Sequence, residues 1–422
     1  MSAKSAHGLL SYLEAASCVA RHAQRLARSK PATERVKLDA ASGRVLAQVL
    51  CAESDLPPFA RSTRDGYACR AAELSAHRPL AVAGSTRAGD PPSGPLARGT
   101  VWEIMTGAPI PRGADAVAML EHVESAGAAG AIRLLPPRTI EKGENIVARG
   151  AQARKGAVLL PTGTLIGPAQ IALAASCGVS QLTVYVRPRV AILSTGDELV
   201  PIASKPQPGQ IRNSSSAMLA AMVAAAGGDP WLLPIARDTE KSLRAALLRA
   251  ASADLVLITG GVSAGKFDLV EPVLARLGAR FHFTGVRIQP GKPLVFGELP
   301  RSTEPNQNQN GTKCLGMPGN PVSTAVTFLL FAAPLVARLA GRIDPGPRFA
   351  LARLTEDVKV KPGLTRFLPA ACSFSAPEPR VALVPWQGSG DLAAMARANC
   401  FLVVPEDSGR LKAGAAVRIL LF

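Results

Sequence analysis

The stretch VAILSTGDELV (190–200) decides the fold, because a short buried strand here runs into a glycine turn that carries two acidic side chains. Downstream of it, strand-like and helical segments alternate as far as residue 341. The strand-like segments are WLLPIA (231–236), ADLVLITGG (253–261) and FHFTGVRI (281–288), and the helical ones are SSAMLAAMVAAAG (215–227), TEKSLRAALLRAA (239–251), LVEPVLARLG (269–278) and PVSTAVTFLLFAAPLVARLAG (321–341). This alternation predicts an α/β domain with a parallel, doubly wound sheet.

The regions on either side of this domain have a different pattern. From Cys51 to Gly143, short strand-like runs lie between Pro- and Gly-rich turns and predict a small β-rich module. After Pro345, the chain returns to short β segments, which predict a small C-terminal barrel or sandwich. An amphipathic helix is predicted from Leu9 to Arg28, and a polar loop at 300–312 joins two strands of the α/β domain.

The length and charge of the chain limit its function. At 422 residues it is long enough for about three domains, or four small ones. Its 48 Lys and Arg residues exceed its 31 Asp and Glu residues by 17, which suits nucleic acid, anionic lipid or a phosphorylated small molecule. The basic residues are spread along the chain, and we recognise no nucleic-acid motif with interleaved aromatic residues, so nucleic-acid binding ranks last.

Cysteine and histidine usage points to a cytoplasmic protein. The seven cysteines are scattered without a CxxC pair, which predicts reduced thiols rather than a disulfide framework. The five histidines lack the spacing of a zinc site. The longest apolar stretch, Ala325 to Val336, is about a dozen residues and contains Pro334, so we expect a core helix rather than a membrane span.

Four loops of the α/β domain carry the residues of a candidate site. In an open parallel sheet, ligands bind where the carboxyl ends of strands meet the amino ends of helices. Glycines there let the backbone approach a phosphate, and carboxylates on neighbouring loops could share Mg²⁺ with substrate phosphates. The candidate residues are Ser194, Thr195, Gly196, Asp197, Glu198, Asp238, Gly260, Gly261, Ser263, Gly265, Asp268, Pro318, Gly319, Asn320, Pro321 and Ser323.

Each of these residues also has a purely structural explanation. Asp238 and Asp268 each precede a predicted helix and are natural N-caps, and Asp268 with Glu271 resembles a capping box. Lys292 follows a turn that could present its side chain to a ligand, or it could be an ordinary surface lysine. The convergence of four such loops on one sheet edge is what favours a binding site.

Seven motifs together resemble those of the molybdopterin molybdenumtransferases, the family that includes the E domain of gephyrin. They occur in the family's order over nearly the whole chain. The motifs are PPFARSTRDGYA (57–68), IMTGAPIPRGADAV (104–117), GENI (143–146), VAILSTGDELV (190–200), ITGGVSAGKFD (258–268), QPGKP (289–293) and GMPGNPVS (316–323).

The resemblance implies a four-domain subunit that forms a homodimer. Its domains would be an elongated helical or linker domain (1–50 and 146–186), an inserted β-rich lobe (51–145), an α/β domain resembling molybdopterin adenylyltransferase (187–343) and a C-terminal β-barrel (344–422). In the family, the active cleft lies between the α/β domain of one subunit and the β-rich lobe of the other.

The resemblance also implies a reaction. Adenylyl-molybdopterin and molybdate would give molybdenum cofactor and AMP, with the help of Mg²⁺ or another divalent cation. Glu198, Asp238 and Asp268 would serve the metal and the pterin phosphate, and Lys292 would neutralise anionic charge. Asp65 and Thr106, which lie in turns with no chemistry of their own, would be supplied across the dimer interface. Pro318 and Pro321 would shape the loop that holds the substrate.

The chain departs from the family's usual residues at three places. Ala60, Arg61 and Arg64 replace an Asp-Asn pair and a Met, Ala151-Gln152 replaces an acidic Glu-Asp, and Gln289 stands where a Lys is frequent. Each change alters the charge near the expected cleft. The first adds positive charge for an anionic ligand, or marks a specialised paralogue.

Two other functions stay open. The protein could be a molybdopterin adenylyltransferase, although that fold needs neither the β-rich lobe nor the barrel. It could also be a non-catalytic carrier of the cofactor or a scaffold, against which the intact set of three carboxylates argues. Molybdopterin adenylyltransferase and cofactor-receiving enzymes are possible partners, and the sequence leaves open whether molybdate or tungstate is the substrate.

Overall fold

A computed structural model describes residues 9–26, 31–127, 130–262, 268–300, 311–375 and 377–422. The chain folds into two compact units. Unit 1 comprises residues 1–47, 163–168 and 181–422, and unit 2 comprises residues 48–162 and 169–180. The four domain boundaries proposed from the sequence are finer than this division and stay a prediction.

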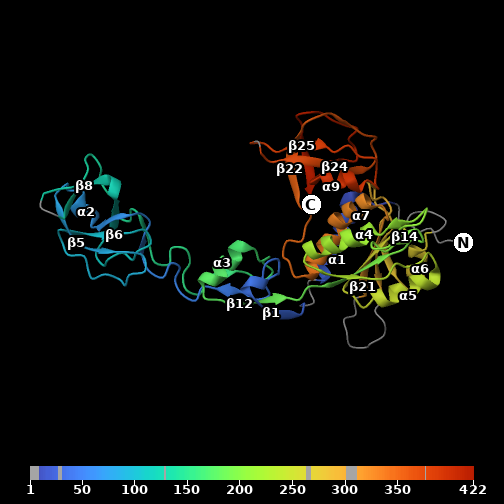
Figure 1. Ribbon diagram of the computed structural model, residues 1–422, viewed down its shortest axis with the longest axis horizontal. Helices are drawn as coiled ribbons and strands as arrows, with labels where there is room; N and C mark the ends of the chain where they lie inside the picture. Colours follow the sequence, from blue (N-terminus) through green and yellow to red (C-terminus); the bar gives the residue numbers. More distant parts are fainter. Residues whose placement is uncertain (1–8, 27–30, 128–129, 263–267, 301–310, 376) are drawn as a thin grey trace. The chain divides into compact units, whose positions relative to one another are not determined.

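The centre of unit 1 is a six-stranded sheet that follows the predicted alternation (Figure 1). Its strands lie in the order β16-β13-β17-β21-β20-β18, and the first four are parallel. Successive residues of a strand face opposite sides of a sheet, so each buried strand contributes side chains to the hydrophobic core on either face. The strands are β13 (Arg189–Ser194), β16 (Asp229–Leu232), β17 (Leu255–Thr259), β18 (Arg280–Phe283), β20 (Val295–Leu299) and β21 (Thr312–Met317).

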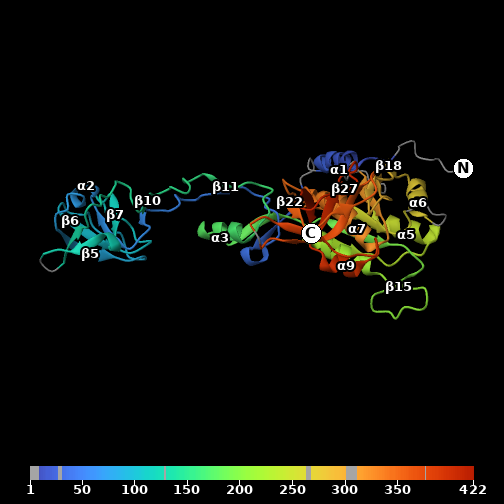
Figure 2. The same ribbon diagram turned by 90° about the horizontal axis from the view of Figure 1, so that it is seen from above.

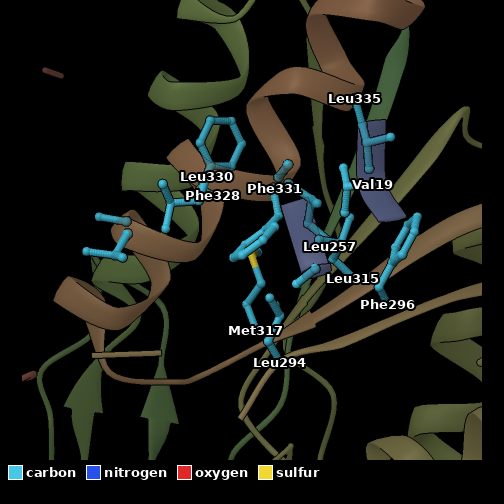
Figure 3. Close-up of a cluster of buried hydrophobic side chains, with 14 of the residues drawn as sticks. Val19, Leu257, Leu294, Phe296, Leu315, Met317, Phe328, Leu330, Phe331 and Leu335 are labelled. Carbon is cyan, nitrogen blue, oxygen red and sulfur yellow. The ribbon is translucent and has the colours of Figure 1, made fainter. Parts of the chain in front are cut away.

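Helices cover both faces of this sheet, which makes the domain doubly wound. One face packs against α1 (Tyr12–Leu26), α4 (Ser214–Ala225), α7 (Pro321–Thr327) and α8 (Ala333–Leu339). Figure 3 shows the centre of this core, where Val19 of α1 lies near Leu335 of α8. The other face packs against α5 (Glu240–Ala250) and α6 (Val270–Arg276), which lie side by side in Figure 2.

The direction of two strands and the start of the N-terminal helix differ from the sequence prediction. The strand predicted at 281–288 is β18, which is shorter and antiparallel to β20, and β20 is antiparallel to β21. β20 and β21 follow each other along the chain and pair with each other in the sheet, and an antiparallel pair needs no crossover connection. Most of the predicted polar loop between them, at 301–310, lies outside the described residues. The N-terminal helix begins at Tyr12 rather than at Leu9.

The long apolar helix is a core helix, as predicted. α7, a π-helical segment (Phe328–Ala332) and α8 run on from Pro321 to Leu339. This helix passes the length and composition test for a membrane span, but 78% of its apolar window is buried inside the protein.

The C-terminal part of unit 1 is a closed barrel, one of the two alternatives that the sequence left open. Five strands close it, in the order β24-β25-β22-β28-β26, because β26 also pairs with β24. The strands are β22 (Phe349–Leu354), β24 (Thr365–Ser373), β25 (Arg380–Leu383), β26 (Cys400–Val404) and β28 (Ala416–Leu421), with α9 (Leu392–Arg397) between β25 and β26. Shorter strands of unit 1 are β1 (Thr33–Lys37), β12 (Gln181–Tyr185), β14 (Leu199–Val200), β15 (Ile211–Arg212), β19 (Ile288–Gln289), β23 (Val358–Lys359) and β27 (Arg410–Leu411).

Unit 2 contains the predicted β-rich module. Its main sheet has six strands in the order β7-β4-β6-β5-β9-β8. These are β4 (Gly66–Cys69), β5 (Leu80–Thr86), β6 (Thr100–Ile104), β7 (Ala116–Met119), β8 (Val123–Ser125) and β9 (Ala131–Leu134). The remaining elements are β2 (Leu50–Cys51), β3 (Arg61–Ser62), β10 (Ile146–Val147), β11 (Val158–Leu160), α2 (Ala71–Leu74) and α3 (Pro168–Ser176), of which Pro168 belongs to unit 1.

Candidate active site

The predicted site loops leave the sheet of unit 1 at its carboxyl edge. β13, β17 and β21 are in register, so that Ser194 lies opposite Thr259, and Thr259 opposite Met317, at their last residues. Just beyond the strands, Thr195 forms a parallel bridge with Ala236. The loops that follow these strands are therefore adjacent, as an open parallel sheet requires.

A cleft of about 570 Å³ lies at this edge, within unit 1. Its walls combine a half-buried carboxylate, Asp268, with an exposed cation, Lys292, and the amide side chain of Asn320. Such a mixture suits an anionic ligand that also carries hydrogen-bonding groups. The predicted site residues on its walls are Gly261, Asp268, Lys292, Pro318, Gly319, Asn320 and Ser323.

The barrel supplies a wall of the cleft that sequence reasoning missed. Trp386 and Ser389 line it, and the Ser389 hydroxyl accepts a hydrogen bond from Asn320 Nδ2 at 3.0 Å. The Ser389 carbonyl also accepts from the Val322 amide, at 3.0 Å. The sequence signal was a Gly-Ser-Gly turn before α9, but nothing local indicates that this turn faces the loop at 318–320.

Asp238 does not cap a helix, so the structural explanation for it was wrong. The N-cap of α5 is Thr239, whose side chain accepts from the Ser242 amide. Asp238 instead accepts from the Thr195 hydroxyl (2.6 Å) and from the amide of Asp197 (3.3 Å). Its carboxylate is therefore hydrogen-bonded to the loop after β13 and not to the first turn of α5.

Asp268 also lies outside the cap position of its helix. The N-cap of α6 is Leu269, without a side-chain cap hydrogen bond, so the capping box expected for Asp268 and Glu271 is not in register. Asp268 is left on the wall of the cleft. The predicted residues Ser263 and Gly265, which precede it, lie outside the described residues.

Ser194 lies beneath the loops rather than on their surface. It is 1% exposed, and its hydroxyl is 2.8 Å from Ser216 Oγ and 2.9 Å from Thr259 Oγ1. Asn213, which caps α4, completes this buried polar network. These contacts join the ends of β13 and β17 to the start of α4, and so fix the positions from which the site loops leave the sheet.

One glycine of the site is required by close packing. A Cβ on Gly260 would collide with the backbone carbonyl of Thr195, and the φ of Gly260 is +89°. The loops after β13 and β17 can therefore approach each other only with glycine at this position. The Glu198 carboxylate folds back over Gly196, where a Cβ would lie 2.6 Å from one of its oxygens.

The described residues contain no ready-made metal site. No three His, Cys, Asp or Glu side chains in that part of the chain come close enough together to hold an ion. Of the three predicted metal carboxylates, Asp268 lines the cleft, and Glu198 and Asp238 belong to the neighbouring loops. Carboxylate oxygens are nevertheless the right ligands for Mg²⁺, which commonly takes one or two of them and completes its shell with waters and substrate phosphates.

Asp65 and Thr106 of unit 2 are bonded to each other. Asp65 Oδ1 accepts from the Thr106 amide at 2.6 Å and from the Thr106 hydroxyl at 2.7 Å. The amide hydrogen bond, followed by that of the hydroxyl, holds the pKa of Asp65 below its usual value. Both residues are exposed, so an ionised carboxylate stands on the surface of unit 2.

The departures from the family pattern lie in both units, at residues 60–64 and 151–152 of unit 2 and at Gln289 of unit 1. Arg64, next to Asp65, is exposed, and Arg61 lies half-buried in β3. Gln152 is exposed and is held through its backbone amide, which donates to the Leu56 carbonyl. Gln289 lines the cleft beside Lys292, so one cation fewer faces a ligand there than in the usual pattern.

Three family models match successive parts of the chain. Residues 10–178 match the MoeA N-terminal region (domain I and II), and residues 191–338 match the probable molybdopterin binding domain. Residues 351–422 match the MoeA C-terminal region (domain IV). Together the matches cover most of the chain.

Curated relatives and solved structures agree with these matches. The chain is 34% identical to a molybdopterin molybdenumtransferase of Haemophilus influenzae over 92% of this chain and 93% of the relative. It is 33% identical to the enzyme of the same name from Bacillus subtilis, over 92% and 90%. The crystal structure of the molybdopterin biosynthesis moeA protein from Pyrococcus horikoshii OT3 superposes with a TM-score of 0.77 at 31% identity, over 98% of this chain and 100% of that one. The chain therefore belongs to the molybdopterin molybdenumtransferase family.

Proposed function

We propose that this protein inserts molybdate into adenylyl-molybdopterin, releasing AMP and forming molybdenum cofactor. Its family membership supports this reaction. The observation that carries the assignment within the molecule is the cleft between the α/β domain and the barrel, where Asp268, Lys292 and Asn320 face one space.

The protein's task in this reaction is to neutralise charge and to position the substrates, rather than to form a covalent bond with them. A phosphoanhydride is cleaved while an oxyanion docks onto a dithiolene, and preorganised charges stabilise such steps. Lys292 would neutralise substrate anions, and Asn320, steadied by Ser389, would orient them. The loop from Pro318 to Pro321, which closes one wall, would exclude water from the bond that breaks.

We propose that a divalent cation, Mg²⁺ in the simplest case, assists this reaction. Asp268 on the cleft wall would bind it together with substrate phosphate oxygens and waters. Asp238 and Glu198, on the neighbouring loops, would act on the cation through waters or the substrate, because no three carboxylates in the described part of the chain lie close enough to share one ion. When bound, the cation would neutralise charge on the phosphoanhydride and on the departing AMP.

We further propose that the protein acts as a homodimer in the cytoplasm. Asp65 and Thr106 of one copy would then serve the cleft of a second copy. The free state of all seven cysteines is compatible with a reducing compartment. An adenylyltransferase and cofactor-receiving enzymes are the partners to test for.

Incubation with adenylyl-molybdopterin, Mg²⁺ and either molybdate or tungstate tests the proposal, with AMP release measured by chromatography. We expect AMP only when both an oxyanion and the cation are present. A carrier would bind adenylyl-molybdopterin and leave it intact. An adenylyltransferase would instead consume ATP in the presence of molybdopterin. Either of those results would contradict the proposed function.

A further inference from the structure

We propose that Thr195 and Asp197 are positioning residues that fix the Asp238 carboxylate in one orientation at the carboxyl edge of the sheet. The inference rests on the proposed function, in which Asp238 acts on the reaction. It gives Thr195, which the sequence named only as a candidate residue of the binding site, the role of a residue that acts through Asp238.

Both carboxylate oxygens of Asp238 are engaged from the loop after β13. Oδ1 accepts from the Thr195 hydroxyl at 2.6 Å, and Oδ2 accepts from the Asp197 amide at 3.3 Å. Asp197 in turn accepts from the Asp238 amide with its own Oδ1, also at 3.3 Å. A carboxylate offers about four lone-pair directions, so two remain, and the clamp fixes where they point.

Thr195 is placed to hold Asp238 and not to meet a ligand. It is 4% exposed, so its hydroxyl is hidden from the solvent side of the loop. Its amide donates to the Thr259 carbonyl at 3.0 Å, and its carbonyl is in such close contact with Gly260 that a Cβ there would collide with it. The Asp238 loop and the end of β17 therefore hold Thr195 still, and a fixed donor preorganises the carboxylate that it binds.

Three threonine variants separate positioning from general packing. Thr195→Val keeps the shape and removes the donor, whereas Thr195→Ser keeps the donor. Thr312→Val is the matched control, because Thr312 is also buried, at 2% exposed, and its hydroxyl donates to the Ala251 carbonyl at the opposite edge of the same sheet. We expect about tenfold slower AMP release in Thr195→Val at saturating substrate, with wild-type rates in Thr312→Val and recovery of most of the rate in Thr195→Ser.

A double-mutant cycle and amide exchange complete the test. In an Asp238→Ala background, Thr195→Val should slow AMP release no further, because its effect runs through Asp238. NMR should show the Asp197 amide exchanging several-fold faster in Thr195→Val than in Thr195→Ser or Thr312→Val. Unchanged exchange, or an effect of Thr195→Val that adds to that of Asp238→Ala, would overturn the inference. Faster exchange together with a wild-type protein that releases no AMP would refute the proposed function while supporting the clamp.

Discussion

Two aspartates in separate regions of the molecule are each held by a threonine, in different ways. In unit 2, Thr106 gives both its amide and its hydroxyl to one oxygen of Asp65. In unit 1, Thr195 and Asp197 engage one oxygen each of Asp238. The donors in the described part of the chain thus reach only Oδ1 of Asp65.

This difference separates two tasks for a carboxylate. Asp65 is exposed, and its second oxygen is available to whatever approaches the surface of unit 2. Asp238 is half-buried and both of its carboxylate oxygens accept hydrogen bonds, so its negative charge is held in one position. We therefore expect Asp238 to matter through its charge and Asp65 through its accessibility to a second copy.

The largest effect should come from Asp238→Asn. The change removes the charge but keeps the shape, and the Asn amide could still accept from the Asp197 amide with its oxygen and donate to the Thr195 hydroxyl with its nitrogen. We expect AMP release to fall about tenfold or more, which is about 1.4 kcal/mol in the barrier, with little change in melting temperature. Thr239→Ala is the control, since it removes the actual cap of α5 and should cost about 1 kcal/mol of stability without slowing AMP release. Equal rates in the Asp238 variant and the wild type would remove Asp238 from the chemistry.

The second prediction concerns the two aspartates together. If Asp65 serves the cleft of another copy, a dimer that pairs an Asp65→Ala subunit with an Asp238→Ala subunit has one complete site. Random pairing of the two slow variants should then raise the rate to about a quarter of that of the wild type, because half of the dimers are mixed and each has one complete site of two. Co-expression followed by AMP assays measures this. A mixture that stays as slow as its components would show that the two residues act within one subunit or not at all.

The smallest effect is on stability and concerns two histidines. Unlike the two hydrogen-bonded aspartates, each of them has a buried ring nitrogen without a hydrogen-bond partner among the described residues. The rings of His22 and His282 stack with centroids 3.9 Å apart. Burial lowers the pKa of both to about 4, helped by nearby Lys313, while Glu298 opposes the shift. Arg25 acts in the same direction as Lys313 on both rings, and Arg280 does so on His282.

Because the unfolded chain binds these protons more tightly, the stability that the neutral pair provides is complete above about pH 6.5 and is lost as the pH falls toward 4. We expect the melting temperature to drop by several degrees over that window, and to drop less in His22→Phe. Calorimetry at a series of pH values measures both proteins, and identical pH profiles would contradict this account.

The sequence predicts the order of elements better than it predicts individual contacts. Alternation of strands and helices indicates the α/β sheet because periodicity is local, and the positions of Asp268 and Asn320 on one edge follow from the topology. The place of Lys292 on the same cleft was implied only by the family resemblance. The two strands on either side of the 300–312 loop were predicted, but their antiparallel direction was missed because strand direction depends on pairing, which periodicity does not encode. Cap assignment at Asp238 was wrong by one residue, since Thr239 is also a favourable cap residue and tertiary contacts decide between the two.

Local sequence patterns could not predict that the barrel forms a wall of the cleft. Ser389 meets Asn320 across 69 positions of sequence, and a Gly-Ser-Gly turn has no signature that specifies a distant partner. The buried network around Ser194 has the same origin. Its hydroxyl-bearing side chains come from three separate elements, so the sequence could name the serine but not the bonds that hold it.

The measurement that tests the central claim most directly compares AMP released with molybdenum inserted in a single turnover. Purified protein is loaded with adenylyl-molybdopterin, mixed with Mg²⁺ and molybdate, and separated from free oxyanion. AMP is then quantified by chromatography and pterin-bound molybdenum by mass spectrometry. The account predicts equimolar AMP and inserted molybdenum, and neither product when molybdate is omitted. AMP released at the same rate without molybdate, or molybdenum bound while adenylyl-molybdopterin stays intact, would contradict it.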